Sequence, residues 1–526
     1  MVRKLNHNDN SNSFAVSQVM DKKKISKLKI IHIAAEAAPF STVGGMSSVI
    51  TYLSRTLAKD GHDVSIFMPK FGFIDEKTYP LELVYKGLKV PTGHTKDPNF
   101  PSHLICNVKR YVAEDGVSFY FLENMEYYEK RSNVYNYSDD YLRWALLAYG
   151  SLQYISNHME KEPDIIHVHD WHTALVPNIV FKEYKPKGKF ENTSCVLTIH
   201  NISFQGQSID PASELNFDDG KSRIPAFYND RFKKLNFLKR GIIYSDIVNT
   251  VSEGYARQIL TQAYGCGLEI LLMELRSKLF GIINGIDYVK FDPQNDPFLE
   301  ANFSINTVER RLINKKKLQK EFNLEQDDGV PIFAFVGRLD HQKGVDLMIE
   351  VVEKFLKDFN AQFVLIGSGD MELEKGAKRL AEKFPKKVGV HTYANFTLPK
   401  LVFGGADMLL MPSRFEPCGI VQMETMRYGA IPIVRATGGL DDTVEDFNPS
   451  DLTGNGFKFK DFDGWSLYGQ MVRAQETYRN KTVWKQIQLN AMSTDFSWDN
   501  IADKYIALYN KAIHFKKEGY FNKNLE

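Results

Sequence analysis

Cysteine is scarce in this sequence of 526 residues. The four cysteines lie far apart, without the short spacing of a metal site, at positions Cys106, Cys195, Cys266 and Cys418. This usage argues against a disulfide framework and favours a reducing compartment. Long hydrophobic runs are lacking too, since none approaches the ~20 apolar residues that a membrane helix needs. We therefore expect no membrane partner.

An excess of charge of one sign is also missing. Lysine and arginine number 66 against 65 acidic residues, so the formal net charge is +1. That balance argues against nucleic acid or an anionic membrane surface as the main partner. Hydrophobic residues make up 43% and charged residues 25%, which is typical of a soluble globular protein. The length predicts two to four domains.

Residues 1–27 differ from the rest because they are rich in Asn, Ser and Lys. They lack the apolar core of a secretory signal, so we expect a disordered tail on a cytoplasmic protein. Basic residues outnumber acidic ones here, which leaves a transit peptide, and a plastid location, as the alternative.

Short apolar runs alternate with helical patterns from residue 28 onward. The first series of expected strands covers residues 28–34, 62–70, 164–169, 194–199 and 246–251. A second series covers residues 331–340, 362–370, 406–413 and 430–439. This rhythm predicts an α/β protein with two Rossmann-like, doubly wound parallel-sheet domains that face each other across a cleft.

The domain boundaries follow from turn signals. We place an N-terminal domain at 28–283 and a C-terminal domain at 284–495, with the junction at the Asn284-Gly285 turn. Residues 496–526 are predicted to form a last helix, which packs back on the N-terminal domain, and a tail. Because ligands of such sheets bind beyond the carboxyl ends of the strands, the loops there are the candidate sites.

Two strand-end motifs in the first half carry candidate chemistry. Gly44 and Gly45 precede a helix, where backbone N–H groups can approach a phosphate, although a plain tight turn is the alternative. His167 and His169 share one face of a strand, and Asp170, Trp171 and His172 follow at its end. We interpret this set as a polar sugar-binding or acid–base wall and expect no metal; a metal site and ordinary structure remain the alternatives.

The next strand ends at His200 and Asn201, a pair that can hydrogen-bond sugar hydroxyls or serve structure alone. In the second half, Arg338 and Lys343 bracket a strand-to-helix turn. Two cations at such a turn suit a diphosphate, because Arg grips two oxygens and Lys acts as a point charge; a solvated basic turn is the alternative.

The loop 414–419 opens another helix and carries Glu416. Glu424 lies about two helical turns further on, and Thr437-Gly438-Gly439 forms an N–H-rich turn after a strand. Cys418 is a poor candidate for a nucleophile, since no sequence feature supplies a base for it.

Together these motifs resemble the bacterial and plant glycogen (starch) synthases, a retaining glycosyltransferase family with the GT-B fold. The resemblance runs from about residue 29 to residue 509. It is carried, in order, by HVHDWHTALVP, TIHNISFQG, YGCGLE, NGID, VGRLDHQKG and PSRFEPCGIVQMETMRYGAIPIVRATGGLDDTV.

The resemblance implies transfer of glucose from ADP-glucose to the non-reducing end of an α-1,4-glucan, such as glycogen or starch. It implies no cofactor, because the nucleotide-glucose is a co-substrate. Three alternatives stay open: UDP-glucose as donor, a short maltosyl acceptor, and a catalytically silent glucan-binding relative.

Residue roles carry over position by position. The resemblance makes His200, Arg338, Lys343 and Glu416 the catalytic set, with the two cations neutralising the leaving diphosphate. On the donor side it places Gly44, Gly45, Asn284, Cys418, Gly419, Glu424, Thr437, Gly438 and Gly439. On the acceptor side it places Tyr135, Asp170, Trp171, His172 and Asn201.

One loop departs from the family pattern, Lys-x-Gly-Gly-Leu-x-Asp. Thr42 stands where the family has its lysine, and Ser48 where it has its acid. A positive charge is therefore missing from the expected phosphate or acceptor region. The departure predicts slower turnover or another acceptor, a changed donor preference, or loss of synthase activity.

Overall fold

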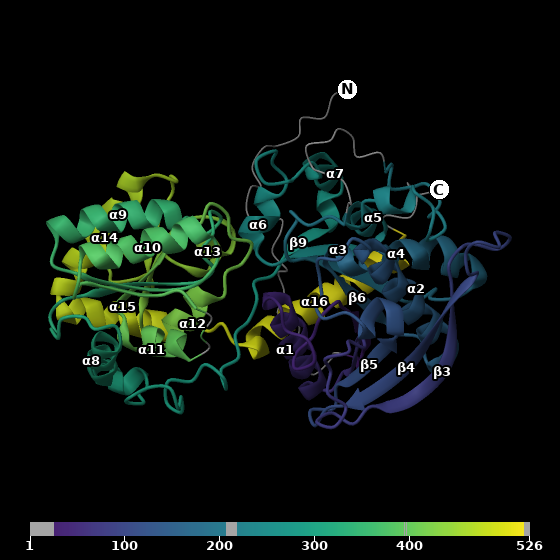
Figure 1. Cartoon of the computed structure of the whole chain (residues 1–526), viewed down its shortest axis with the longest axis horizontal. Helices are drawn as coiled ribbons and strands as arrows, with labels where there is room; N and C mark the ends of the chain where they lie inside the picture. Colours follow the sequence, from purple (N-terminus) through teal and green to yellow (C-terminus); the bar gives the residue numbers. More distant parts are fainter. Residues whose placement is uncertain (1–25, 207–217, 394, 396, 520–526) are drawn as a thin grey trace. The chain divides into compact units, whose positions relative to one another are not determined.

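A computed structural model describes residues 26–206, 218–393, 395 and 397–519. The chain divides into two compact units (Figure 1), one formed by residues up to Ile282 together with those from Ile501, the other by Ile283–Asn500. Our boundaries from the sequence were 283/284 and 495/496. The expected tail, 1–27, lies outside the described residues except for its last two positions.

The described part of the first unit is built on a nine-stranded sheet in the order β3-β4-β5-β2-β1-β6-β7-β8-β9. Its strands are β1 (Lys29–Ile33), β2 (Asp63–Pro69), β3 (Glu82–Pro91), β4 (His103–Val112), β5 (Ser118–Glu123), β6 (Ile165–His169), β7 (Ser194–Ile199), β8 (Ile247–Thr250) and β9 (Leu279–Gly281). β1, β6 and β7 are almost entirely buried, which explains their continuous apolar sequences.

The strands of this sheet are parallel except at one edge. β1 pairs in parallel with β2 and β6, whereas β4 pairs antiparallel with β3 and β5. This antiparallel edge was not predicted from the sequence, because exposed and buried residues are mixed along β3 and β4, which therefore form no apolar runs.

Helices of the first unit cover the sheet. They are α1 (Gly45–Lys59), α2 (Asp140–His158), α3 (Asp170–Thr173), α4 (Leu175–Ile179), α5 (Phe237–Tyr244), α6 (Glu253–Gln258) and α7 (Glu269–Glu274). Most of α16 (Trp498–Lys517) belongs here too and runs past β6 in Figure 1. Its Tyr505 and Tyr509 are fully buried, and the Tyr509 hydroxyl hydrogen-bonds His167 Nδ1 at 2.9 Å. The last helix therefore packs on the first unit.

The second unit repeats the plan with a six-stranded, all-parallel sheet in the order β12-β11-β10-β13-β14-β15. Its strands are β10 (Ile332–Val336), β11 (Gln362–Ile366), β12 (Val388–His391), β13 (Met408–Met411), β14 (Ile431–Arg435) and β15 (Phe457–Phe459). Its helices are α8 (Arg311–Glu321), α9 (Val345–Asp358), α10 (Met371–Lys383), α11 (Leu398–Gly405), α12 (Val421–Arg427), α13 (Gly438–Thr443), α14 (Gly464–Arg479) and α15 (Lys481–Ser493).

Each sheet has a topological switch point, where the strand order reverses direction. It lies between β1 and β6 in the first unit and between β10 and β13 in the second. Ligands of doubly wound sheets bind at these points, beyond the carboxyl ends of the strands. Within the described part of the chain, no helix combines the length and apolar character that a membrane crossing requires.

Candidate active site

The switch point of the second unit brings Lys343 and Glu416 together. Lys343 follows β10 and Glu416 follows β13, and Lys343 Nζ lies 2.5 Å from Glu416 Oε2. The same Glu416 oxygen accepts a hydrogen bond from the Ser413 hydroxyl at 3.2 Å. Two residues of the catalytic set that the resemblance implies therefore form one ion pair.

Glycine makes this close approach possible. Gly344, which caps α9, has φ +69°, and a Cβ on it would lie 2.1 Å from the Pro412 carbonyl oxygen. Any side chain at this position would push apart the two loops that carry Lys343 and Glu416.

Arg414 also joins the two loops. Its guanidinium grips the Asp346 carboxylate of α9 with contacts of 3.0 and 2.8 Å, and its backbone N–H donates to the Gln342 carbonyl at 2.8 Å. The sequence reading did not assign Arg414 a role. A cation at the end of an apolar strand, in a loop that contains proline and glycine, was the signal that could have indicated it.

Arg338 is the exposed member of the cation pair. Its side chain is 71% exposed, and its contacts are with Asp340 at 3.3 Å and Gln342 at 3.4 Å. Arg338 is thus held loosely, whereas Lys343 is tied to Glu416. Both cations belong to the turn after β10, as expected.

The turn 437–439 packs directly on the loop that follows Glu416. Gly439 donates its N–H to the Glu416 carbonyl at 3.1 Å, and a Cβ on Gly439 would lie 2.1 Å from the Cys418 carbonyl oxygen. Gly419 and Gly438 have φ +73° and +48°. This glycine requirement explains the glycine-rich pattern at both places.

Cys418 has a structural partner. Its buried Sγ accepts the N–H of Asn284 at 3.4 Å, and burial raises the pKa of the thiol to about 12. A thiol that stays protonated at neutral pH is a poor nucleophile, as the sequence indicated. The side-chain Oδ1 of Asn284 is buried and has no partner among the described residues.

Glu424 lies on α12, where burial raises the pKa of its carboxyl to about 7 while the charges of Lys290 and Lys400 lower it. Its protonation therefore changes within the neutral pH range. Shifted carboxyl pKa values are frequent at functional sites.

In the first unit, the glycine loop is held by Glu36, which the sequence reading missed. Glu36 Oε2 accepts the N–H of Val43 at 2.6 Å and that of Gly44 at 3.3 Å. The N–H of Gly44 is therefore bonded to Glu36 inside the protein and is not available to a ligand.

Asp170 positions the His200 loop. Its Oδ1 accepts the backbone N–H groups of His200 at 2.7 Å and Asn201 at 3.3 Å. Burial raises the pKa of Asp170 to about 7, although these two donors lower it. The backbone of Asp170 has φ +52°, a strained conformation for a residue other than glycine. Asp170 thus acts through the loop that it orients.

Four histidines gather where β1, β6 and β7 end. His32, His167 and His169 are buried, and one ring nitrogen from each lies within 4.8 Å of the other two. His169 also contacts His200. Such a group could geometrically hold a metal ion. However, both nitrogens of His167 already bond hydroxyls, at 2.9 Å to Tyr509 and 2.7 Å to Thr198, which indicates a hydrogen-bonded network. His32 was missed, because one histidine in an apolar strand looks structural.

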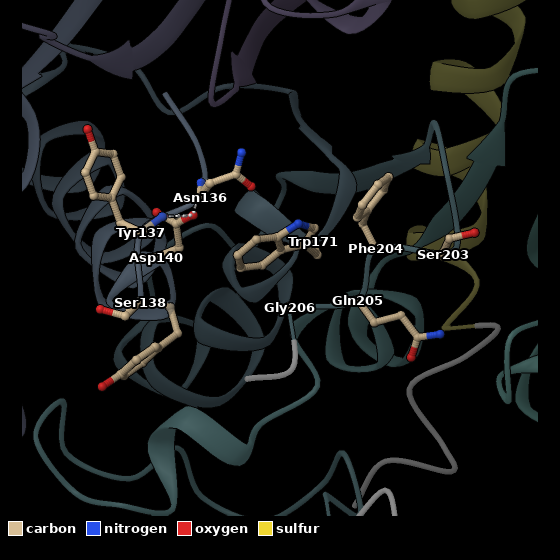
Figure 2. Close-up of a pocket in the computed structure, with 10 residues that line it drawn as sticks. Asn136, Tyr137, Ser138, Asp140, Trp171, Ser203, Phe204, Gln205 and Gly206 are labelled. Atoms are coloured by element: carbon tan, nitrogen blue, oxygen red, sulfur yellow. Dashed lines mark hydrogen bonds between the residues drawn. The ribbon is translucent and has the colours of Figure 1, made fainter. Parts of the chain in front are cut away.

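Trp171 lines a pocket of about 370 Å³. Figure 2 shows its indole between the segment 136–140 and Phe204, whose side chain is 60% exposed. The pocket wall contains Asn136, Tyr137, Ser138, Asp140, Tyr141, Trp171, Ser203, Phe204, Gln205 and Gly206. Aromatic faces and short polar side chains of this kind suit a sugar surface.

The other predicted acceptor-side residues do not line this pocket. His172 is buried among aromatic rings, with centroids 4.8 Å from Tyr135, 5.2 Å from Trp144 and 4.5 Å from Trp171. Burial lowers its pKa to about 3. His172 therefore packs between the rings of Trp171 and Tyr135.

Two doubly wound units, each with polar strand-end loops at its switch point, are the architecture of the GT-B fold. Residues 29–274 match the model of the starch synthase catalytic domain, and residues 316–467 match that of glycosyl transferases group 1. The chain belongs to the glycogen (starch) synthase family and is a hexosyltransferase.

The relatives match over nearly their full length. The glycogen synthase of Thermotoga maritima is 37% identical over 494 residues, 92% of this chain and 99% of the relative. That of Streptococcus uberis is 36% identical over 492 residues, with the same two shares. Among solved structures, the catalytic domain of starch synthase IV from Arabidopsis thaliana bound to ADP and acarbose has a TM-score of 0.80, at 30% identity, and covers 93% of this chain and 100% of that one.

Proposed function

We propose that this protein transfers glucose from ADP-glucose to the non-reducing end of an α-1,4-glucan, with retention of the anomeric configuration. The observation that carries the proposal is the Lys343–Glu416 pair beside Arg338 at the switch point of the second unit. In this pair, a cation assigned to the diphosphate directly contacts a carboxylate assigned to the sugar.

On the donor side, departure of ADP develops negative charge on a phosphate oxygen. Fixed cations stabilise such charge most strongly where water is excluded. Arg338 and Lys343 are assigned this role, and Glu416 is assigned the glucose hydroxyls. The Arabidopsis enzyme, which was solved with ADP, supports an adenine nucleotide.

On the acceptor side, we assign the glucan to the pocket beside Trp171. Its aromatic faces and hydrogen-bonding side chains fit the rings and hydroxyls of a polysaccharide. The related starch synthase was solved with acarbose. We propose no metal or other cofactor.

Retention follows from same-face attack in this proposal. The acceptor hydroxyl attacks the carbon that ADP leaves, on the same face, and the departing phosphate oxygen takes its proton. The sugar becomes oxocarbenium-like, as in glycoside hydrolysis. Glu416 is a poor covalent nucleophile because one of its oxygens is engaged by Lys343 and Ser413.

A catalytically silent glucan-binding protein is the second candidate, and the loop at Thr42 favours it. The family lysine is missing there, and the Gly44 N–H is occupied by Glu36. Against it stands the complete set Arg338, Lys343, Glu416 and Glu424 in the second unit.

Incubation with radiolabelled ADP-glucose or UDP-glucose and glycogen distinguishes these functions. We expect label in glycogen from ADP-glucose, and its complete release by an α-1,4-specific glucosidase. Label from UDP-glucose alone would reverse the donor assignment. No incorporation from either donor, with glycogen still bound, would establish the silent protein. Lys343→Ala, for which we expect transfer about 100-fold slower, is measured alongside the wild type.

A further inference from the structure

A chain of three histidines connects the core of the first unit to its strand-end loop. His32 Nδ1 lies 3.1 Å from His169 Nε2, and His169 Nδ1 lies 3.2 Å from His200 Nε2. His32 comes from β1, His169 from β6, and His200 follows β7, so the chain crosses three neighbouring strands. It ends at the residue that the family resemblance places beside the transferred glucose.

The histidines of this chain are neutral at neutral pH. Burial lowers the pKa of His32 to about 3 and that of His169 well below its ordinary value, and the pKa of His200 is lowered as well. Each neutral imidazole has one N–H donor and one acceptor nitrogen. The two hydrogen bonds between the three histidines must therefore run in the same direction. Either each histidine donates to the next one from His32 toward His200, or each donates in the opposite direction.

The inner end of the chain decides between the two directions. His32 Nε2 is buried and has no hydrogen-bond partner among the described residues. If the chain pointed inward, this atom would be an orphaned N–H; if it points outward, the atom is an acceptor. Among buried backbone groups, orphaned N–H donors are rarer than under-satisfied carbonyl acceptors, and we apply the same preference to the ring nitrogens. The outward direction is therefore favoured.

The outward direction determines the proton position on His200. His169 donates from Nδ1 to His200 Nε2, so the proton of His200 sits on Nδ1. His200 is half-buried, and its Nδ1 has no hydrogen-bond partner among the described residues of the protein. That N–H is thus the donor that His200 offers to a ligand.

We propose that His32 and His169 are positioning residues that hold His200 as its Nδ1–H tautomer, so that His200 donates a hydrogen bond to a hydroxyl oxygen of the transferred sugar. The sugar at His200 rests on the proposed function, whereas the tautomer is a property of the protein alone. In this state His200 binds the sugar and does not act as a base from Nδ1.

The direct test is nitrogen NMR of the protein labelled with ¹⁵N-histidine, without substrate. The chemical shifts of the two ring nitrogens report which one carries the proton, and the signals of His200 are those missing from His200→Gln. We expect Nδ1 to be protonated. Protonation of Nε2 instead would overturn the proposal, and so would stoichiometric zinc on the purified protein, because a metal would take over the ring nitrogens.

Two variants of His169, the middle histidine, are nearly equal in size but differ in whether they can donate a hydrogen bond to His200. The amide of His169→Asn can donate to His200 Nε2, whereas the carboxylate of His169→Asp can only accept. We expect the NMR signature of wild type in the Asn variant. In the Asp variant, at a pH where NMR shows neutral His200, we expect the proton on Nε2.

Kinetics then separate positioning from structure. We expect kcat/KM for the sugar nucleotide within about threefold of wild type in the Asn variant and at least tenfold lower in the Asp variant, which loses one hydrogen bond to the sugar. Equal values in the two variants would overturn the proposal. If the Asp variant does not fold, the NMR spectrum of the wild-type protein still shows which nitrogen of His200 carries the proton and so tests the proposal. If ADP-glucose is not a donor, only the kinetic arm fails, so the two proposals are tested separately.

Discussion

Lys343 and Glu416 share one ion pair, with 2.5 Å between Nζ and Oε2, although 73 residues of sequence separate them. Each side chain compensates the charge of the other. A diphosphate that binds Lys343 must therefore compete with Glu416. Under the proposed roles of Lys343 and Glu416, this one contact couples the affinity for the nucleotide to the binding of the glucose.

The first prediction concerns the loss of the cation. We expect Lys343→Ala to lower kcat for glucose transfer about 100-fold, because a fixed charge that stabilises the leaving oxygen is worth on the order of 3 kcal/mol. Lys354→Ala is the matched control, since Lys354 lies on the adjoining α9 in an exposed pair with Glu350. Turnover near that of wild type in Lys343→Ala would remove the diphosphate assignment.

The second prediction concerns the loss of the negative charge at the same contact. In Glu416→Gln the shape is kept and the negative charge is removed, so Lys343 is released for phosphate. We expect tighter ADP binding in calorimetry, by about tenfold for a gain near 1.4 kcal/mol, together with a lower kcat because the glucose loses its carboxylate. Weaker ADP binding than in wild type would contradict the coupling.

Much of the fold could be predicted from the sequence. Buried parallel strands such as β1 and β10 are continuous apolar runs, and their loops end in polar residues, so both doubly wound units were predicted. The antiparallel edge β3–β4 could not be, because its half-exposed strands lack such runs. Its pairing is a long-range property that local pattern does not encode.

The residues of the site could be predicted from the sequence, but the contacts between them could not. Arg338, Lys343 and Glu416 were identified by type and place, yet the sequence gives no sign that two of them pair. Glu36 and His32 were missed because each is a single polar residue within an apolar strand or the loop that follows it. Only the register of neighbouring strands reveals that His32 stands beside His167.

The third prediction concerns the loop that lacks the family lysine. Thr42 is exposed, so Thr42→Lys should fold normally and add a cation beside the glycine loop. We expect a lower KM for the sugar nucleotide or a higher kcat. Val43→Lys is the matched control, because its side chain is 62% exposed and adds the same charge one position away. Kinetics identical to wild type would show that this loop does not reach the phosphates.

The fourth prediction contrasts two cysteines. Burial raises the pKa of Cys418 to about 12, whereas Cys266 is exposed. We expect iodoacetamide at pH 8 to alkylate Cys266 and leave Cys418 unmodified, as read by peptide mass spectrometry. Full activity after alkylation would agree with a structural Cys418. Rapid loss of activity that tracks modification of Cys418 would make it a functional thiol.

The fifth prediction follows from Glu424, whose pKa of about 7 is set by burial against the charges of Lys290 and Lys400. The resemblance places Glu424 on the donor side, where an ionised carboxylate is the better acceptor for hydroxyls of the sugar nucleotide. Below pH 7 the ionised fraction falls about tenfold per pH unit. The KM for ADP-glucose should therefore rise as the pH falls from 7 to 5. Glu424→Gln should show a high KM that stays flat over this interval, which separates Glu424 from Asp170, since both titrate near pH 7. Lys290→Met removes a nearby cation, so the rise should begin at a higher pH than in wild type. A wild-type pH profile in Glu424→Gln would assign the titration to another group.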